Sequence, residues 1–239
     1  MSSERQRQLP KRFYKAAEAG AVGAGFGVLL DGRPVRTPGG APLVTPTMAL
    51  AELLAVEWAG QGEAIDLSAM PATRLAFSAI DRVAAKHAEV AAEVGRYAGS
   101  DVLCYFADGP GTLVERQVQR WGPVLDWARD ELGLVLHRAT GIIHRAQPPE
   151  TVAAVESLAL AADDFALAGL AMAAGLYGSA VLALALYHDR LSGLAAFDLS
   201  RLDEEFQEEK WGVDAEALAR RGVLTADANM LDAWFQALR

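Results

Sequence analysis

Twenty-four consecutive residues, Phe165–His188, carry no formal charge, and this stretch limits most strongly what the chain can fold into. A run of that length is long enough to cross a bilayer as a helix. However, eight of the residues from Phe165 to Leu186 are alanine and three are glycine, and these small residues drive membrane insertion weakly. The flanking pairs, Asp163-Asp164 and Asp189-Arg190, also lack the excess of lysine and arginine that orients a membrane span. The sequence therefore predicts two short buried helices with a break at Gly178, in a protein that is not integral to a membrane.

The N-terminal part of the chain, residues 1–65, is rich in glycine and proline and has the pattern of β-structure. Phe26–Leu30 is a short apolar run, Asp31-Gly32 is a turn dipeptide, and Arg33–Thr37 is a second extended run. This order is typical of a β-hairpin. Because the prolines of the second run cannot donate a hydrogen bond to a sheet, we expect that strand to lie at an edge.

Helical patterns dominate the rest of the chain. Thr45 is predicted to cap a helix that ends the N-terminal domain, and a long amphipathic helix is predicted over residues 80–97. A further helix is predicted to end at Gly133. The fold class is therefore α+β, with a small β-rich domain at 1–65 that contains a hairpin and ends in a helix, and a larger multi-helical domain at 66–239. The five tryptophans fall mostly on apolar faces and are predicted to lie in the core: Trp58, Trp121, Trp127, Trp211 and Trp234.

Charge and cysteine content exclude several classes of protein. The chain has 31 acidic and 22 basic residues, a formal charge of -9 and a pI of about 5.0. An acidic surface disfavours nucleic-acid binding, because that binding depends on basic groups that neutralise phosphates. The single cysteine, Cys104, excludes an internal disulfide and a C-x-x-C pair, and its apolar neighbours indicate a buried thiol rather than a nucleophile. The polar start, Met1–Tyr14, lacks the apolar core of a secretory signal, so we expect a protein of a reducing compartment.

No catalytic motif stands out along the chain. The glycines between Gly20 and Gly27 do not match G-x-G-x-x-G, and neither a phosphate-binding G-x-x-x-x-G-K-[ST] nor a G-x-S-x-G sequence occurs. The four histidines form no H-E-x-x-H pair. We therefore predict no catalytic residue, no metal site and no cofactor.

The strongest concentration of charge is a predicted acidic helix near the C-terminus. Ser200 and Asp203 resemble a capping box at its start. Such a helix is either a solvated face or a partner surface, on which carboxylates meet arginine and lysine of another chain. Its five carboxylates within seven residues are Asp203, Glu204, Glu205, Glu208 and Glu209.

Two other classes of function stay open on residue chemistry alone. An enzyme would have to assemble its site from dispersed residues such as Arg74, Asp81, Asp101 and His144, and a deep pocket that joins them would support it. An interaction module for another assembly would share the acidic helix and the lack of catalytic motifs. Only the identity of its partner would show which assembly such a module serves.

Short blocks of residues are spread over nearly the whole chain. Taken together, their order and spacing form a pattern that is specific enough to compare with a known family. The blocks are Arg12–Lys15, Leu30–Pro38, Glu57-Trp58, Met70–Ala76, Ala79–Asp81, Tyr97, Asp101, Leu103–Tyr105, Gln117, Trp121–Pro123, Leu202–Gln207 and Trp211-Gly212. In these blocks the chain resembles the ATP12 chaperones, the assembly factors of the F1 sector of ATP synthase.

The resemblance implies a chaperone that binds the unassembled F1 α subunit, prevents its aggregation and releases it when the β subunit arrives. It implies no enzymatic step and no cofactor. Family members usually carry glutamate where this chain has Asp203, so the charge is kept while the side chain is one methylene shorter. The implied client-binding residues are Asp203, Glu204, Glu205 and Glu208.

Other matching residues are expected to be structural. Trp58 matches a family tryptophan that we assign to folding. Asp31 and Gly32 form the predicted hairpin turn, and Pro71 begins a matching block.

The family also suggests a compartment. Eukaryotic members carry a mitochondrial transit peptide, whereas this chain reaches Arg12–Lys15 after only eleven residues. The short start and the alanine-rich composition predict a bacterial protein of the cytoplasm, and a eukaryotic source would place it in the mitochondrial matrix. We expect a monomer with the F1 α subunit as its partner and no nucleic acid.

Overall fold

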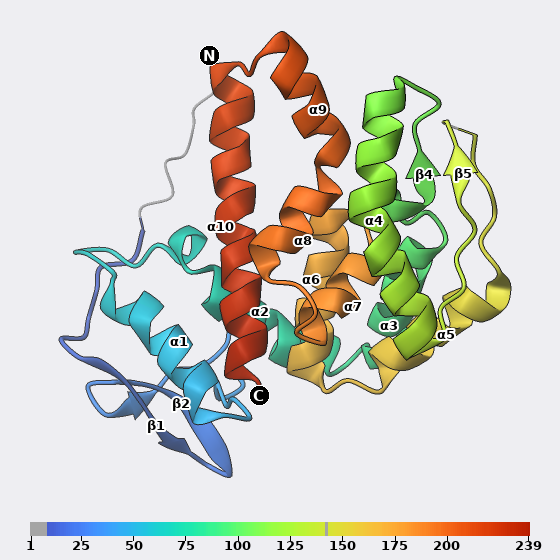
Figure 1. Ribbon diagram of the computed structural model, residues 1–239. Coiled ribbons are helices and arrows are strands. Elements are labelled where there is room, and N and C mark those ends of the chain that lie inside the picture. The colour runs from blue at the N-terminus through green and yellow to red at the C-terminus, as the bar shows by residue number, and fades with distance from the viewer. Residues whose placement is uncertain (1–8, 142) are drawn as a thin grey trace, which may run out of the picture. The chain divides into compact units, whose positions relative to one another are not determined.

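The computed structural model describes residues 9–141 and 143–239 and is mostly helical (Figure 1). The chain forms two compact units, one made of the residues up to Asp81 together with Ala237–Arg239, the other of Arg82–Gln236. A small antiparallel sheet precedes a larger multi-helical region, which confirms the predicted α+β class. The start of the chain, for which the sequence predicts no secretory signal, lies largely outside the described residues.

The sheet of the first unit is the predicted hairpin with one added strand. Its order is β1 (Ala17–Val22), β2 (Gly25–Leu30) and β3 (Arg33–Pro34), and all neighbours are antiparallel. As the prolines predict, β3 is a short edge strand.

The turn between β2 and β3 needs unusual backbone conformations, which Asp31 and Gly32 provide with φ angles of 47° and 80°. The Asp31 carboxylate accepts hydrogen bonds from the backbone N–H groups of Ala16 at 2.8 Å and Lys15 at 3.1 Å. These bonds, with Ala16 first, lower the pKa of Asp31. Both residues therefore act in the turn itself, where an ionised aspartate ties the chain before β1 to the end of β2.

Helix α1 (Met48–Ala59) packs against β1 and β2. Thr47 caps it, because its hydroxyl accepts a hydrogen bond from Leu50 N–H at 3.1 Å. The predicted cap at Thr45 is wrong. Thr45 instead exchanges backbone hydrogen bonds with Phe26 of β2, at 2.7 and 3.1 Å, so the sheet uses this residue before the helix can begin.

The first unit extends beyond the boundary predicted after residue 65 because α1 holds the start of α2 (Pro71–Ser78). The Glu57 carboxylate accepts hydrogen bonds from the N–H groups of Ala72 at 2.8 Å and Thr73 at 2.7 Å. These are N–H groups of the first turn, which have no partner inside the helix. A glutamate on α1 thus caps α2 and keeps it in the same unit.

Replacing Glu57 with alanine should therefore lower the free energy of unfolding by roughly 1–2 kcal/mol, as for the loss of a helix cap. Urea unfolding followed by circular dichroism measures the change. Glu52→Ala is the matched control, since Glu52 is an exposed glutamate of the same helix and should cost less than about 0.5 kcal/mol. Equal stabilities of the two variants would contradict the capping role.

The second unit is built of helices and one small parallel sheet. Figure 1 shows α9 and α10 as two arms of a hairpin. The elements of the second unit are α3 (His87–Ala98), the short turn η3 (Val102–Cys104), β4 (Tyr105–Phe106), α4 (Gly111–Leu132), β5 (Ala139–Thr140), α5 (Pro149–Leu160), α6 (Asp164–Tyr177), α7 (Ala180–Tyr187), α8 (Gly193–Ser200), α9 (Leu202–Trp211) and α10 (Ala215–Ala237). Two other helical turns come earlier in the chain: η1 (Leu67–Ala69) belongs to the first unit, and η2 (Ala79–Val83) begins in it.

The uncharged stretch forms α6 and α7, which confirms the predicted pair of helices and their break. Gly178 ends α6 with a φ of 62°, a left-handed conformation that favours glycine. The Ser179 hydroxyl then caps α7 by accepting a hydrogen bond from Leu182 N–H at 2.9 Å. Residues 180–186 are all buried, at the centre of the unit. Within the described chain, no helix is both long and apolar enough to span a membrane.

The prediction of one helix over residues 80–97 is wrong. The chain makes a π-helical turn at Ala79–Val83, leaves helical geometry by Lys86 (φ −135°, ψ 31°) and restarts at α3. A π-helical turn closes its hydrogen bonds over five residues instead of four, but the apolar residues on both sides of it still fit one helical stripe in the sequence, so periodicity did not reveal the break.

Of two further predictions about helix ends, one is confirmed and the other is wrong. Gly133 ends α4 in the left-handed region, with a φ of 69°, as predicted. The predicted capping box at Ser200 is wrong, because Ser200 is the last residue of α8 and its hydroxyl donates to the carbonyl of Phe197 at 2.7 Å. Helix α9 begins at Leu202, and its N-cap residue, Arg201, makes no side-chain capping hydrogen bond within the described residues.

Tryptophan burial follows the prediction for most of the five residues. Trp58, Trp121 and Trp234 are buried, and Trp127 is half-buried. Trp211 is the exception, with 78% of its surface exposed. It is the last residue of α9 and lines the candidate site.

Candidate functional site

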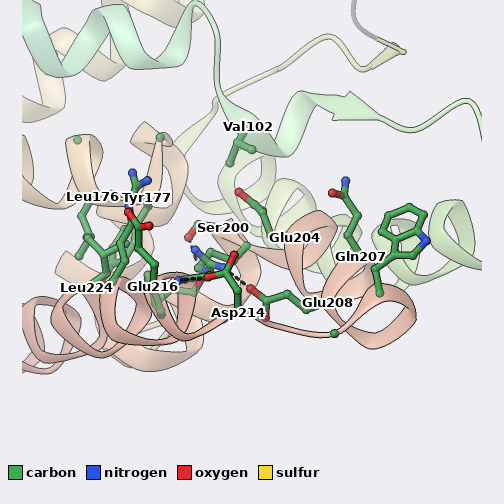
Figure 2. A pocket seen from close by; sticks show the side chains of 18 residues that line it. Val102, Leu176, Tyr177, Ser200, Glu204, Gln207, Glu208, Asp214, Glu216 and Leu224 are labelled. Carbon is green, nitrogen blue, oxygen red and sulfur yellow. Dashed lines mark hydrogen bonds and ion pairs between the residues drawn. The ribbon is translucent and has the colours of Figure 1, made fainter.

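A cleft of about 840 Å³ opens in the second unit between α9 and α10 (Figure 2). Its walls come from one face of α9 and from the first turns of α10, and its base comes from the end of α6 and from α8. We call it the α9–α10 cleft. Three of the residues around it decide what it can bind: Glu204, Gln207 and Trp211.

The acidic helix α9 presents different carboxylates to different neighbours. On the side of α4, Asp203 accepts a hydrogen bond from Gln117 Nε2 at 2.7 Å, and Gln117 in turn accepts one from Ala107 N–H at 2.8 Å. Burial raises the pKa of Asp203. On the same side Arg116 forms a two-pronged ion pair with Glu209, at 2.6 and 2.9 Å, which lowers the pKa of that glutamate. These contacts hold α9 on α4.

Glu205 and Glu208 also hold α9 to α10, although Arg120 of α4 lies 3.9 Å from Glu205 as well. Arg221 of α10 contacts Glu205 at 3.1 Å and Glu208 at 3.2 Å, and Arg201 contacts Glu208 at 2.9 Å. The two glutamate side chains are only 20% and 17% exposed, so solvent screens these pairs less than surface ion pairs. Burial, followed by the nearby Asp198 carboxylate, raises the pKa of Glu205. The two carboxylates are therefore already engaged inside the molecule.

The remaining face of α9 points into the cleft. Glu204, Gln207, Glu208 and Trp211 are three, four and seven residues apart and so share one side of the helix. Figure 2 shows Glu204 and Gln207 extending from this side. The Glu204 carboxylate is exposed and has no hydrogen bond or ion pair with any residue in the described part of the chain. Among the four predicted binding carboxylates, Glu204 is thus the one available to another molecule.

The opposite wall belongs to α10 and carries acidic, basic and apolar side chains. Asp214 precedes the helix and caps it by accepting a hydrogen bond from Ala217 N–H at 2.7 Å. Glu216 and Arg220 add one charge of each sign, and Leu224 adds apolar surface deeper in the cleft. At the base, the Tyr177 hydroxyl donates to the carbonyl of Gly193 at 3.1 Å.

The dispersed residues of the enzyme hypothesis do not form a site in either unit. In the second unit Asp101 is fully buried and accepts hydrogen bonds from the N–H groups of Leu103 at 3.1 Å and Val181 at 3.0 Å. His144 is exposed, and its Nδ1 lies 2.9 Å from the hydroxyl of Tyr105. Neither residue lines the α9–α10 cleft.

In the first unit Asp81 accepts hydrogen bonds from the Thr37 hydroxyl at 2.7 Å and from Gly39 N–H at 2.9 Å, whereas Arg74 is exposed on α2. These are structural contacts of a loop. Residues 9–141 and 143–239 contain no group of three or more histidine, cysteine, aspartate or glutamate side chains placed to hold a metal ion. The Cys104 thiol is buried, and burial raises its pKa.

The residues expected to be structural lie in the first unit. Trp58 is 6% exposed, its carbonyl accepts a hydrogen bond from the Tyr14 hydroxyl at 2.7 Å, and the two rings meet edge to face. Trp58 also forms part of an apolar cavity of about 460 Å³ with Phe77. Pro71 is the first residue of α2, a position that suits proline because the missing N–H would have no partner there.

The site residue that sequence reasoning missed is Trp211. The sequence predicts it to lie in the core only because most of the five tryptophans fall on apolar faces. A local signal was available, since Glu208, Glu209 and Lys210 precede it and Gly212 follows, so no apolar stripe runs through its position. Trp211 also lies seven residues after Glu204, so the two residues share one face of the helix.

Comparisons with known proteins agree on one family. The model of the family described as ATP12 chaperone protein matches residues 11–129. The chain is similar to the crystal structure of Atp12 from Paracoccus denitrificans, with 40% identity, a TM-score of 0.90 and coverage of 96% of this chain and 99% of that one. An aspartate-to-lysine mutant of the same Paracoccus protein matches with 40% identity and a TM-score of 0.90, covering 96% and 98%.

The third similar structure is Atu1473 from Agrobacterium tumefaciens, described as a candidate chaperone. It has 43% identity and a TM-score of 0.90, and the match covers 97% of this chain and 87% of that one. With 40% identity over nearly the whole length of a solved Atp12, and with the family model matched in the same chain, this protein belongs to the ATP12 chaperone family.

Proposed function

We propose that this protein binds the unassembled α subunit of F1-ATP synthase, prevents its aggregation and releases it to the β subunit. The α9–α10 cleft is the proposed binding site. The observation that supports this most directly is the exposed Trp211 on the same face of α9 as Glu204, whose carboxylate has no hydrogen bond or ion pair within residues 9–141 and 143–239. A large exposed aromatic side chain in a hollow of the surface is typical of a protein interaction site.

The binding residues divide into two roles in this proposal. Glu204 contacts the client. Asp203, Glu205 and Glu208 position α9, the first through Gln117 and the other two through Arg221. The acidic helix thus serves as a rigid support whose outer face is left free for the client.

The proposed mechanism needs no enzymatic step and no cofactor. Binding the assembly face of the α subunit lowers the free concentration of its aggregation-prone form by mass action. Release follows when the β subunit competes for the same face. This exchange would take place in the cytoplasm of a bacterium, or in the mitochondrial matrix of a eukaryote.

The direct test is a pull-down of separately produced F1 α and F1 β subunits without nucleotide, together with an aggregation assay of each. We expect capture of α, suppression of its aggregation and loss of the complex when β is added. Capture of neither subunit, or of β alone, would refute the proposed function.

Reversing the free charge should weaken this capture. Glu204→Lys is expected to reduce affinity for the α subunit about tenfold or more, because it replaces a carboxylate facing the client with a cation. Thermal unfolding should change little, by about 1 kcal/mol or less, since Glu204 has no hydrogen bond or ion pair within the described chain and only its place in the first turn of α9 favours a carboxylate. Glu131→Lys, at an exposed glutamate of α4 outside the cleft, is the control with the same change of charge. Equal affinities of the two variants would remove Glu204 from the interface.

A further inference from the structure

We infer that the α9–α10 cleft takes an arginine or lysine side chain from a surface segment of the client, held between the Glu204 carboxylate and the Trp211 indole ring. This rests on the proposed function, because it names the part of the α subunit that enters the site.

The net negative charge of the residues that line the cleft favours a positively charged ligand. Four carboxylates line it against two guanidinium groups, and one carboxylate, Glu208, is paired with one guanidinium, Arg201, at 2.9 Å. Three carboxylates then remain against Arg220. The resulting negative potential in a hollow attracts a cation more strongly than it would on a flat surface. The other three carboxylates are those of Glu204, Asp214 and Glu216.

Trp211 gives this cation a second contact. Its ring is 78% exposed and forms no ring contact with another aromatic side chain in the described part of the chain. Tryptophan is the best aromatic partner for a cation placed over its face. The helix rises about 10 Å between residues seven apart, a separation at which the long glutamate and indole side chains can reach two sides of one guanidinium group. Gln207 lies between them and offers its amide oxygen.

The planar shape of a guanidinium group favours arginine over lysine as the bound cation, and the volume of the cleft favours a peptide segment over a single side chain. Guanidinium is planar, so it can donate two hydrogen bonds to Glu204 while it stacks on an indole ring. The cleft volume of about 840 Å³ is at the upper end of the range of roughly 300–1,000 Å³ for ligand sites, which is more than one side chain fills. Leu224 and Ala217 on the α10 wall would contact apolar neighbours of the cation, while Arg220 keeps the cation on the α9 side.

Site-specific photo-cross-linking in the full-length chain tests the inference. p-Benzoylphenylalanine replaces Trp211 in one variant and Gln207, on the same face, in a second, so that capture is retained even if Trp211 itself is required. The control variant carries it at Val118, an exposed residue of α4 outside the cleft. Each variant is irradiated with purified F1 α subunit, and the linked peptides are identified by mass spectrometry.

We expect positions 211 and 207 to link to one region of the α subunit that contains an arginine or lysine, and position 118 to give no such product. Changing that client cation to glutamate should reduce capture about tenfold, and Glu204→Arg in the chaperone should restore part of it. Three outcomes would overturn the inference and leave the proposed function intact. They are capture of α without cross-links at either cleft position, cross-links to a segment without a basic residue, and failure of the charge exchange to restore capture. Absence of capture by the unmodified chain would overturn both.

Discussion

Asp101→Asn is expected to lower the free energy of unfolding of the second unit by roughly 1–3 kcal/mol at pH 7, the cost of one buried hydrogen-bonding group without a partner. The Asp101 carboxylate is fully buried and accepts hydrogen bonds from Leu103 N–H at 3.1 Å and Val181 N–H at 3.0 Å. Asparagine keeps one acceptor oxygen but turns an NH₂ group toward one of these donors. A buried N–H group would then be left without a partner at the start of α7, the central helix of the unit.

The same residue gives the unfolding free energy a characteristic pH dependence. Burial raises the pKa of Asp101 to about 6, above the ordinary value of 3.8. The folded state therefore binds more protons than the unfolded state between these values, and the contribution of Asp101 to stability falls as pH rises from about 3.8 to about 6. Above that window the contribution is constant. Asp101→Asn should lack this slope.

Urea unfolding at a series of pH values from 4 to 7 measures both effects. Asp108→Asn is the matched control, because Asp108 is an exposed aspartate a few residues away. A stability of Asp101→Asn within about 0.5 kcal/mol of the unsubstituted chain, with an unchanged pH profile, would show that the buried carboxylate is not needed to join these segments.

The second large effect is expected from Gly193→Ala. An added Cβ at Gly193, the first residue of α8, would lie 2.0 Å from the carbonyl oxygen of Ala228 in α10 and 2.9 Å from its carbon. Both neighbours are backbone atoms, so no side chain can move aside, and α8 and α10 must separate. We expect a loss of about 3 kcal/mol or more, at the upper end of the range for overpacked sites.

Gly222→Ala is the control for this prediction. Gly222 lies in α10 as well, but nothing lies within 4 Å of its added Cβ. Alanine should stabilise an open helical position by roughly 0.5–1 kcal/mol. Calorimetric unfolding of both variants measures the difference. Similar melting temperatures for the two would mean that α8 and α10 do not approach each other closely at this point.

Local signals succeeded wherever a few neighbouring residues decide the backbone conformation. The Asp31-Gly32 turn requires positive φ angles that these residues adopt, and Gly178 and Gly133 end their helices for the same reason. The capping signals at Thr45 and Ser200 failed because such residues suit several roles. Which role is used depended on the strand beside Thr45 and on the length of α8.

The sequence by itself determined the α+β class, the hairpin, the pair of buried helices and, through its matching blocks, the family. Only the tertiary structure decided which carboxylate of α9 has no partner among the described residues. The charged neighbours of Trp211 indicate its exposure, but the packing around α9 decided it. The partners of the other carboxylates, Gln117 and Arg221, lie 86 residues before Asp203 and 13 residues after Glu208. Helical spacing shows which side chains share a face, but the neighbour that covers each face is set by long-range packing. That packing left one face of α9 uncovered, and with it the candidate site.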